Sequence, residues 1–201
     1  MSVSVVSYGL GNLGSVLNML RRIGADPEVV STPEEIEESE RLLLPGVGAF
    51  DAGMRLLGDA GLVDPIRSFA GSGRPLLGIC LGMQLLLDSS AEGTLPGLGL
   101  VPGHSERFDE STGVRVPHVG WNSVSPTRQD PIFSDLPEEA RFYFVHGYRV
   151  VPERDQDVLG VSDYGVRFAS MIRSANVIGA QYHPEKSHSF GMQILKNFSL
   201  S

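Results

Sequence analysis

The sequence predicts an α/β fold: a flavodoxin-like, mostly parallel central sheet with helices on both faces. Apolar runs typical of buried strands alternate with helical patterns through the first ninety residues, which favours parallel pairing because helices then cover both faces of the sheet. Glycine-rich turns follow several of these runs, as expected where strands pass into helices. From Leu98 onward, runs rich in β-branched and aromatic residues predict added mixed or antiparallel strands in the C-terminal half.

The elements of the first half follow from periodicity and from capping signals. Leu13 begins a helix with one apolar face, and Gly24 follows its end, where glycine is the preferred residue. Thr32 before Pro33 marks the start of a second, acidic helix. The expected strands cover residues 3–8, 28–31, 41–44 and 76–79, and further helices cover residues 33–38, 51–57 and 64–70.

The second half is expected to be mainly strands. A hairpin is predicted around the turn at residues 163–165, and a final helix has its apolar face at Phe190, Ile194 and Phe198. The expected strands cover residues 114–119, 141–151, 158–162, 166–171 and 177–182, and the helix covers residues 187–198. Residues 125–140 hold three prolines and are expected to form a long loop.

Composition restricts the classes of function. The 201 residues are expected to form a single domain covering 1–201. A net charge of −8 with no cluster of Lys and Arg argues against nucleic acid or an anionic membrane as a partner. The single cysteine excludes an internal disulfide framework and suits the reducing cytoplasm. We see no signal peptide and no apolar run long enough to span a membrane.

The single cysteine, Cys80, stands where an apolar strand meets a helical pattern. Gly78 and Gly82 flank it at two residues' distance, which is the G-x-nucleophile-x-G elbow with cysteine in place of serine. The tight crossing leaves no room for side chains at the two flanking positions, and glycine has none. The helix that starts here aims its free N–H groups at the sulfur, which favours the reactive thiolate. We therefore predict that Cys80 is a nucleophile.

A second candidate group closes the last expected strand. Pro184 holds His183 in an extended conformation, so the side chains of His183 and Glu185 point to the same side. Glu185 is then placed to hold one ring nitrogen of His183 and to leave the other free as a general base. No two histidines have the spacing of metal ligands, so we expect no metal and no cofactor.

These motifs resemble those of the class I (triad) glutamine amidotransferases. The resemblance is carried by GICLGMQ at residues 78–84 and QYHPEKS at residues 181–187. Within that class the chain looks most like the glutaminase subunits of imidazole glycerol phosphate synthase, through YGLGN at 8–12, LPGVGAF at 44–50, PHVGWN at 117–122 and FYFVH at 142–146. The resemblance covers nearly the full length of the chain.

The resemblance implies a reaction and a set of site residues. Cys80 would attack the side-chain amide of glutamine, with His183 as acid and base and Glu185 orienting it. The implied oxyanion hole is formed by backbone N–H groups of Val47, Gly48 and Leu81. The implied substrate-binding residues are Gly48, Gln84, Gly147 and Tyr148.

The resemblance also implies a partner for the released ammonia. In the family, ammonia passes to a (β/α)8-barrel cyclase subunit, forming a heterodimer that makes imidazole glycerol phosphate and AICAR in histidine biosynthesis. Asn12, Trp121, Tyr143 and Lys186 match family positions at that contact. One departure is Ser7, where many family members carry Asp, so a contact near the first glycine turn is expected to differ.

Three other interpretations are compatible with the motifs. The same glutaminase chemistry could serve an amidotransferase of surface-glycan sugar biosynthesis, and the gene or protein that accompanies this chain would distinguish that case. An α/β cysteine hydrolase or protease would act on peptides or esters and resist glutamine analogues. A non-catalytic binding module would keep its function after Cys80→Ala. An apparently complete triad favours the glutaminase over the last two.

Overall fold

The computed structural model describes residues 1–201, except for the side chain of Thr112. Its helices are α1 (Leu13–Arg22), α2 (Pro33–Glu38), α3 (Phe50–Asp59), α4 (Val63–Gly71), α5 (Leu81–Leu85) and α6 (His188–Leu200). Its strands are β1 (Ser2–Val6), β2 (Asp26–Val30), β3 (Leu42–Gly46), β4 (Leu76–Cys80), β5 (Ser89–Ser90), β6 (Gly103–Arg107), β7 (His118–Ser123), β8 (Ser125–Pro126), β9 (Arg141–His146), β10 (Tyr148–Pro152), β11 (Val158–Asp163), β12 (Arg167–Ser174) and β13 (Val177–Ala180).

The main sheet has the strand order β2-β1-β3-β4-β13-β12-β10-β6-β5. The first five strands of this order are parallel, and β12, β10 and β6 continue it by antiparallel pairing. This arrangement confirms the mostly parallel sheet with added antiparallel strands. The last strand in the chain, β13, is inserted beside β4, with Ala180 opposite Ile79. Residues just after Ala180 therefore lie beside Cys80, although a hundred positions separate them.

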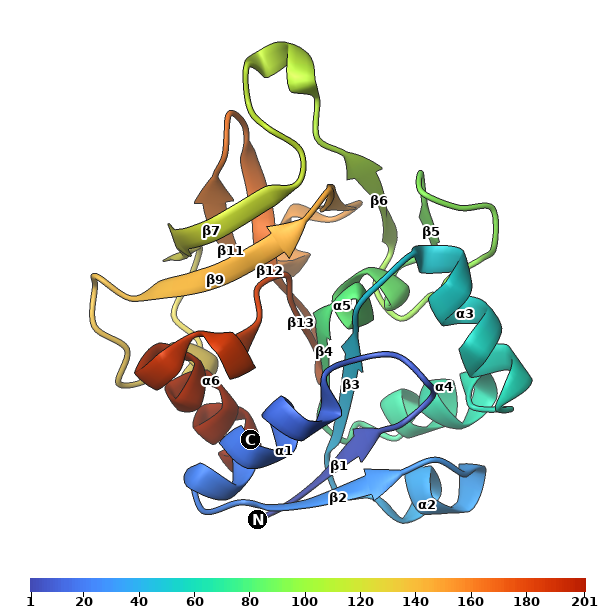
Figure 1. Ribbon diagram of the computed structural model, residues 1–201. Coiled ribbons are helices and arrows are strands. Elements are labelled where there is room, and N and C mark those ends of the chain that lie inside the picture. Colours follow the sequence, from blue (N-terminus) through green and yellow to red (C-terminus); the bar gives the residue numbers. More distant parts are fainter.

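Helices cover both faces of the sheet, as the sequence predicts. Side chains alternate along β3, so that Leu42 and Leu44 join one apolar cluster and Leu43 joins the other. The first cluster packs against α2, α3, α4 and α5, and the second against α1 and α6. In Figure 1, α3 and α4 lie on one side of the central strands, and α1 and α6 lie together on the other.

Several helix ends follow from local capping. Thr32 caps α2 with a full capping box, since its side chain accepts from the Glu35 N–H while the Glu35 carboxylate accepts from the Thr32 N–H. Gly24 follows α1 with a φ of 80°, the left-handed conformation expected after a helix. The helix expected over residues 64–70 is α4, which begins one residue earlier at Val63 and has no side-chain cap.

The C-terminal half differs in detail from the sequence expectation. The single strand expected over residues 141–151 is two strands, because the chain leaves one sheet at Gly147 and enters another. β9 pairs with β7 in a separate two-stranded antiparallel sheet, which we call the β7–β9 ribbon, while β10 joins the main sheet. The strand expected at residues 114–119 begins only at His118, and β5 and β6 were not predicted. Among the described residues, no helix is long and apolar enough to cross a membrane.

Candidate active site

Cys80 sits at the turn between β4 and α5, as the elbow motif predicts. Its φ of 54° and ψ of −109° are unfavourable for a residue with a side chain and are held by the tight crossing around it. A Cβ at Gly78 would lie 2.6 Å from the carbonyl oxygen of Gly82, and a Cβ at Gly82 would overlap the carbonyl oxygen of Leu44. Both glycines are therefore required by close backbone contacts, which confirms their predicted role.

His183 lies three residues beyond the end of β13 and is fixed by β9. Its N–H donates to the carbonyl of Tyr143 at 2.9 Å. The hydroxyl of Ser187 donates to the His183 carbonyl at 2.6 Å and accepts from the N–H of Tyr143 at 3.0 Å. These bonds hold the backbone of His183 from two sides, so the ring has a defined position.

Glu185 holds the ring of His183 as predicted, but not from the extended segment that the sequence led us to expect, because Pro184–Lys186 form a short 3-10 helix. Nδ1 of His183 lies 2.7 Å from Oε1 of Glu185, and the two side chains are only 2% and 3% exposed. Burial lowers the pKa of His183, but its interactions with Cys80 and Glu185 outweigh burial and raise that pKa to about 9. Since Nδ1 is occupied by Glu185, the other nitrogen, Nε2, is the one directed to Cys80. Nε2 is buried and makes no hydrogen bond of standard geometry to the described residues.

Gln181 contacts the sulfur directly, a role that the sequence analysis missed. Its amide Nε2 donates to Sγ of Cys80 at 3.8 Å, and its Oε1 accepts from Nε2 of Gln84 at 3.1 Å. The Gln84 amide also donates to the carbonyl of Tyr148 at 3.4 Å. Gln181 precedes His183 by two residues, so in an extended segment it points to the same side. That spacing is the signal that could have identified it.

A cavity of about 280 Å³ opens at Cys80. This volume is near the lower limit of roughly 300–1,000 Å³ for small-molecule sites, so the cavity suits one small ligand. It brings together Cys80, His183 and every residue named for the oxyanion hole and for substrate binding. Its lining comprises Val47, Gly48, Cys80, Leu81, Gln84, Glu92, Pro117, Val145, His146, Gly147, Tyr148 and His183.

The turn after β3 lines the cavity through Val47 and Gly48. Gly48 has a φ of 115°, which a side chain would strain. The Tyr8 hydroxyl donates to the carbonyl of Pro45 at 2.8 Å, directly before this turn. Burial, with a contribution from Cys80, raises the pKa of Tyr8, so the hydroxyl stays protonated as a donor. Leu81 begins α5, where the first N–H groups lack partners within the helix.

Glu92 adds a carboxylate to the cavity and was also missed. Its Oε2 accepts from the N–H of Phe50 at 2.9 Å, which fixes the side chain at the start of α3. The following loop is anchored by Asp51, whose carboxylate accepts from the N–H groups of Thr94 and Leu95 at 3.0 Å each. Nothing in the local pattern of residues 88–95 marks Glu92, because only the folded loop brings it to Cys80.

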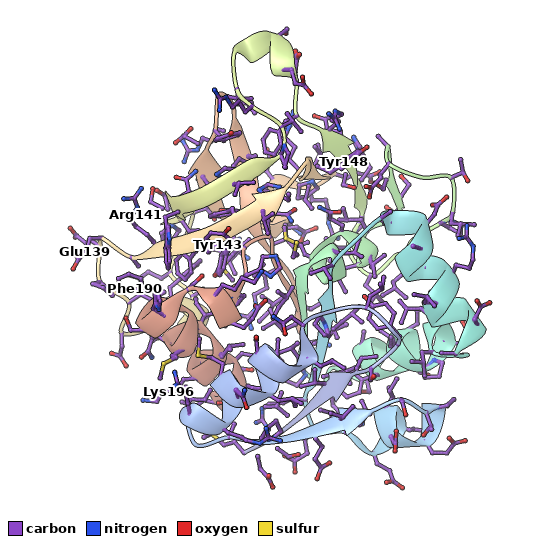
Figure 2. All side chains as sticks on the ribbon, in the orientation of Figure 1. Glu139, Arg141, Tyr143, Tyr148, Phe190 and Lys196 are labelled. Atoms are coloured by element: carbon purple, nitrogen blue, oxygen red, sulfur yellow. The ribbon has the colours of Figure 1, made fainter. Side chains whose placement is uncertain are left out.

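Three of the four residues named for the partner contact form one surface cluster. Trp121 and Tyr143 are paired in the β7–β9 ribbon with ring centroids 6.0 Å apart, and Nζ of Lys186 lies 5.8 Å from the Tyr143 ring. The exposed Trp121 also stacks on His188. Figure 2 shows Tyr143 on β9 and Tyr148 beyond the other end of that strand. Asn12 caps α1, accepting from the Ser15 N–H at 3.4 Å, and α1 contacts the segment Pro184–Lys186 that carries Lys186.

The chain is similar to known proteins over nearly its full length. The model of the family described as glutamine amidotransferase class-I matches residues 4–201. The chain is 49% identical over 197 residues to "imidazole glycerol phosphate synthase subunit HisH 2" of Pseudomonas aeruginosa, covering 98% of both chains. It is 46% identical over 200 residues to "imidazole glycerol phosphate synthase subunit HisH" of Wolinella succinogenes, again covering 98% of both.

Solved structures share the fold at low sequence identity. The chain superposes on the structure described as PurLQS from Thermotoga maritima with a TM-score of 0.75 at 22% identity, covering 99% of this chain and 97% of that one. A chain described as a glutamine amidotransferase gives a TM-score of 0.72 at 21% identity, covering 98% of both.

Proposed function

This chain belongs to the class-I glutamine amidotransferase family, and from that premise we propose that it is the glutaminase subunit of an imidazole glycerol phosphate synthase in histidine biosynthesis. It hydrolyses glutamine to glutamate and ammonia and delivers the ammonia to a synthase subunit. The observation that carries the proposal is the single cavity in which Cys80 meets His183, which Glu185 orients. The match across residues 4–201 supports treating the chain as one amidotransferase domain.

Glutamine binding is the first step of the proposed mechanism. The Glu92 carboxylate, fixed by the Phe50 N–H, has the charge to attract the α-ammonium group of the substrate. The backbone at Gly147 and Tyr148 lines the same cavity and offers polar groups to the α-substituents. The Gln84 side chain, bonded to Gln181 and to the Tyr148 carbonyl, closes one wall of the site.

Acylation follows from the charges around the sulfur. The Cys80 thiolate attacks the amide carbon of glutamine, and the carbonyl oxygen becomes an oxyanion that accepts from the N–H groups of Val47, Gly48 and Leu81. His183 is protonated at neutral pH because its pKa is raised to about 9, so it donates a proton to the amide nitrogen. The C–N bond breaks, neutral ammonia leaves, and a thioester on Cys80 remains.

Hydrolysis of the thioester reverses the proton transfer. His183, now neutral, takes a proton from water, and the resulting hydroxide attacks the thioester carbon. The C–S bond breaks, the new γ-carboxyl group loses its proton to solvent as glutamate leaves, and Cys80 returns as the thiolate beside protonated His183. Glu185 holds Nδ1 throughout, so that Nε2 performs each proton transfer.

The partner in this proposal is a (β/α)8-barrel cyclase subunit that forms a heterodimer with this chain. Ammonia released into water becomes ammonium, which is not a nucleophile, so a direct transfer to the partner is needed. The cluster of Trp121, Tyr143 and Lys186 holds two aromatic residues, of which Trp121 is exposed, and aromatic residues are enriched at interface cores. The single cysteine supports a cytoplasmic location, and no nucleic acid or membrane is part of the proposal.

The test combines covalent labelling with a coupled assay. We expect 6-diazo-5-oxo-norleucine to alkylate Cys80, with Cys80→Ser as the unlabelled control. We also expect a cyclase subunit to make imidazole glycerol phosphate from glutamine only when this chain is present, and from ammonium salts with or without it. Product formation from ammonium but never from glutamine in the presence of this chain would refute the pathway assignment. Absence of labelling would refute the glutaminase chemistry.

A further inference from the structure

Two buried histidines face each other behind the cavity. His118 and His146 are directly opposite in the β7–β9 ribbon, and Nδ1 of His118 lies 3.0 Å from Nε2 of His146. They are only 3% and 5% exposed. Burial lowers the pKa of His118 to about 4 and that of His146 to about 3, so both rings are neutral at neutral pH.

The hydrogen bonds fix which nitrogen carries each proton. Nδ1 of His146 lies 2.7 Å from the carbonyl oxygen of Tyr148, which only accepts, so this nitrogen is the donor. In a neutral ring the other nitrogen, Nε2, is then an acceptor, and Nδ1 of His118 must donate to it. The pair therefore forms a hydrogen-bond chain with one direction, from His118 through His146 to the Tyr148 carbonyl.

The far end of this chain is fixed as well. Nε2 of His118 is an acceptor and lies 3.5 Å from the amide nitrogen of Asn122. That amide also donates to the carbonyl of Asp163 at 2.9 Å, and its oxygen accepts from the N–H of Ser123 at 2.9 Å. Because hydrogen bonds fix both the nitrogen and the oxygen of the Asn122 amide, its N–H stays directed at Nε2 of His118. That nitrogen therefore remains the acceptor, and Nδ1 remains the donor to His146.

Aromatic rings hold the two imidazoles in place. His118 stacks between Phe144, at 4.9 Å between ring centroids, and Tyr164, at 4.0 Å. Phe108 and Phe168 contact both histidines at centroid distances of 5.3–6.4 Å. Such a cluster would accept apolar aromatic residues at both positions, so packing alone does not call for imidazoles there. What the imidazoles add is a donor aimed at one backbone carbonyl.

That carbonyl belongs to the turn that lines the glutamine side of the cavity. His146, Gly147 and Tyr148 all line the cavity, and the turn carries the chain from β9 to β10. The Gly147 carbonyl accepts from the Phe108 N–H at 3.2 Å, and the Tyr148 carbonyl accepts from both His146 and Gln84. With both carbonyls held, the orientation of the two peptide groups is determined.

We propose that His118 and His146 are positioning residues for glutamine binding: a buried imidazole pair that fixes the turn at residues 146–148 through the Tyr148 carbonyl. The inference rests on the proposed function, since it assigns the pair to the glutamine site. A neutral hydrogen bond contributes about 0.5–1.5 kcal/mol, so its loss is expected to weaken binding by roughly threefold to tenfold. The attack by Cys80 does not use these rings, so the maximal rate should change less.

The first test distinguishes the effect of losing the Nδ1–H donor of His146 from the effect of losing its ring. His146→Asn places an amide N–H where Nδ1 was, and His146→Gln places it where Nε2 was and leaves the Tyr148 carbonyl without this donor. The rate of Cys80 alkylation by 6-diazo-5-oxo-norleucine is measured against its concentration. We expect the half-saturating concentration to rise by about threefold to tenfold in His146→Gln, and to stay within twofold of the parent in His146→Asn. Equal values in both variants would overturn the proposal.

The second test changes the histidine pair at a residue that does not line the cavity. His118 does not line the cavity, and His118→Phe keeps an aromatic ring between Phe144 and Tyr164 while removing the donor to His146. We expect a higher half-saturating concentration with little change in the maximal alkylation rate. Because both residues act through one carbonyl, the double variant His118→Phe/His146→Gln should match His146→Gln alone. A lowered melting temperature with unchanged half-saturation would show a structural role only and would overturn the proposal.

The parent protein distinguishes failure of this inference from failure of the proposed function. If the parent is alkylated at Cys80 and the variants behave like it, the positioning role is wrong and the glutaminase assignment stands. If the parent is not alkylated under conditions that label a known glutaminase, the proposed function fails and the inference fails with it.

Discussion

Oε1 of Glu185 lies 2.7 Å from Nδ1 of His183, in surroundings that leave both side chains almost fully buried. A buried carboxylate beside an imidazole favours the protonated ring, and it fixes which nitrogen faces the sulfur. The interactions with Cys80 and Glu185 together raise the pKa of His183 to about 9 despite its burial. The sulfur of Cys80 is therefore paired with a protonated imidazole at neutral pH, which is the state that the proposed acylation requires.

Replacing Glu185 by Gln should impair the reaction and lower the pKa of His183. The amide keeps the size but removes the charge, so the ring loses both its orientation and one cause of its raised pKa. We expect a fall in kcat of about 100-fold or more, within the usual range for an acid–base catalyst. Steady-state glutaminase assays with the partner present measure it, and NMR titration of the ring reports its pKa. Glu139→Gln, at an exposed position, is the control, and equal kcat values in the two variants would contradict the role of Glu185.

A methyl group at Gly82 should disrupt the elbow. Gly82→Ala would drive its Cβ into the carbonyl oxygen of Leu44, a backbone atom that cannot move without shifting β3. We expect destabilisation by about 2 kcal/mol or more and loss of Cys80 alkylation. Gly58→Ala in α3 is the matched control, since its Cβ meets nothing within 4 Å, and it should stabilise the protein by about 0.4–1 kcal/mol. Urea unfolding measures both, and similar stabilities of the two variants would be inconsistent with the crossing geometry.

Mild acid should destabilise the protein through the buried histidine pair. The pKa values of His118 and His146 fall in the folded state from 6.5 to about 4 and about 3, so the unfolded chain binds more protons between these values. Above about pH 6.5 both histidines are neutral in the folded and the unfolded chain, and the protein keeps its full stability. As the pH falls below this value, the unfolded chain binds protons first and the free energy of unfolding decreases. The contribution of His183 to the free energy of unfolding changes little in this range. Its pKa is raised in the folded state, so this contribution is already complete below about pH 6.5, the pKa of the unfolded chain.

The measurement is the free energy of unfolding in urea at pH 6.5 and at pH 5. We expect a loss of about 1–2 kcal/mol from His146 alone. His118→Phe should show a smaller loss than the parent over the same interval, since one titrating ring is gone. A parent whose stability is flat between these pH values would disprove the assignment of neutral rings.

Removing the Asp51 carboxylate should weaken glutamine binding from a distance. Asp51 accepts from the N–H groups of Thr94 and Leu95, and these bonds lower its pKa, so it is ionised at neutral pH. Gly93 packs so closely on this carboxylate that a Cβ there would overlap it. In Asp51→Ala the loop loses this anchor and Glu92 loses its fixed position, so KM for glutamine should rise several-fold with a smaller change in kcat. Asp59→Ala, at the exposed end of α3, is the control, and identical KM values would rule out this anchoring role.

Local signals in the sequence were sufficient to predict the elbow, the pairing of His183 with Glu185 and most of the fold. The elbow around Cys80 could be predicted because its geometry depends on residues within two positions, and the same holds for the His183–Glu185 pair. Alternating apolar runs were sufficient for the parallel sheet, since each strand must bury its own side chains. The partner and substrate residues came from motif resemblance and stay predictions; the fold brings the substrate residues to one cavity and Trp121, Tyr143 and Lys186 to one surface.

Only the tertiary structure decided which distant segments meet. β13 is the last strand in the chain, yet it is inserted beside β4, and this pairing alone puts His183 next to Cys80. Gln181, Glu92 and the His118–His146 pair reach the site through strand register and loop anchoring, which involve partners tens of residues away. Local propensity contains no information about such pairings, because their free energy arises from contacts that exist only once the sheet has formed. The sequence by itself thus pointed to the proposed reacting groups, and the fold determined the environment in which they lie.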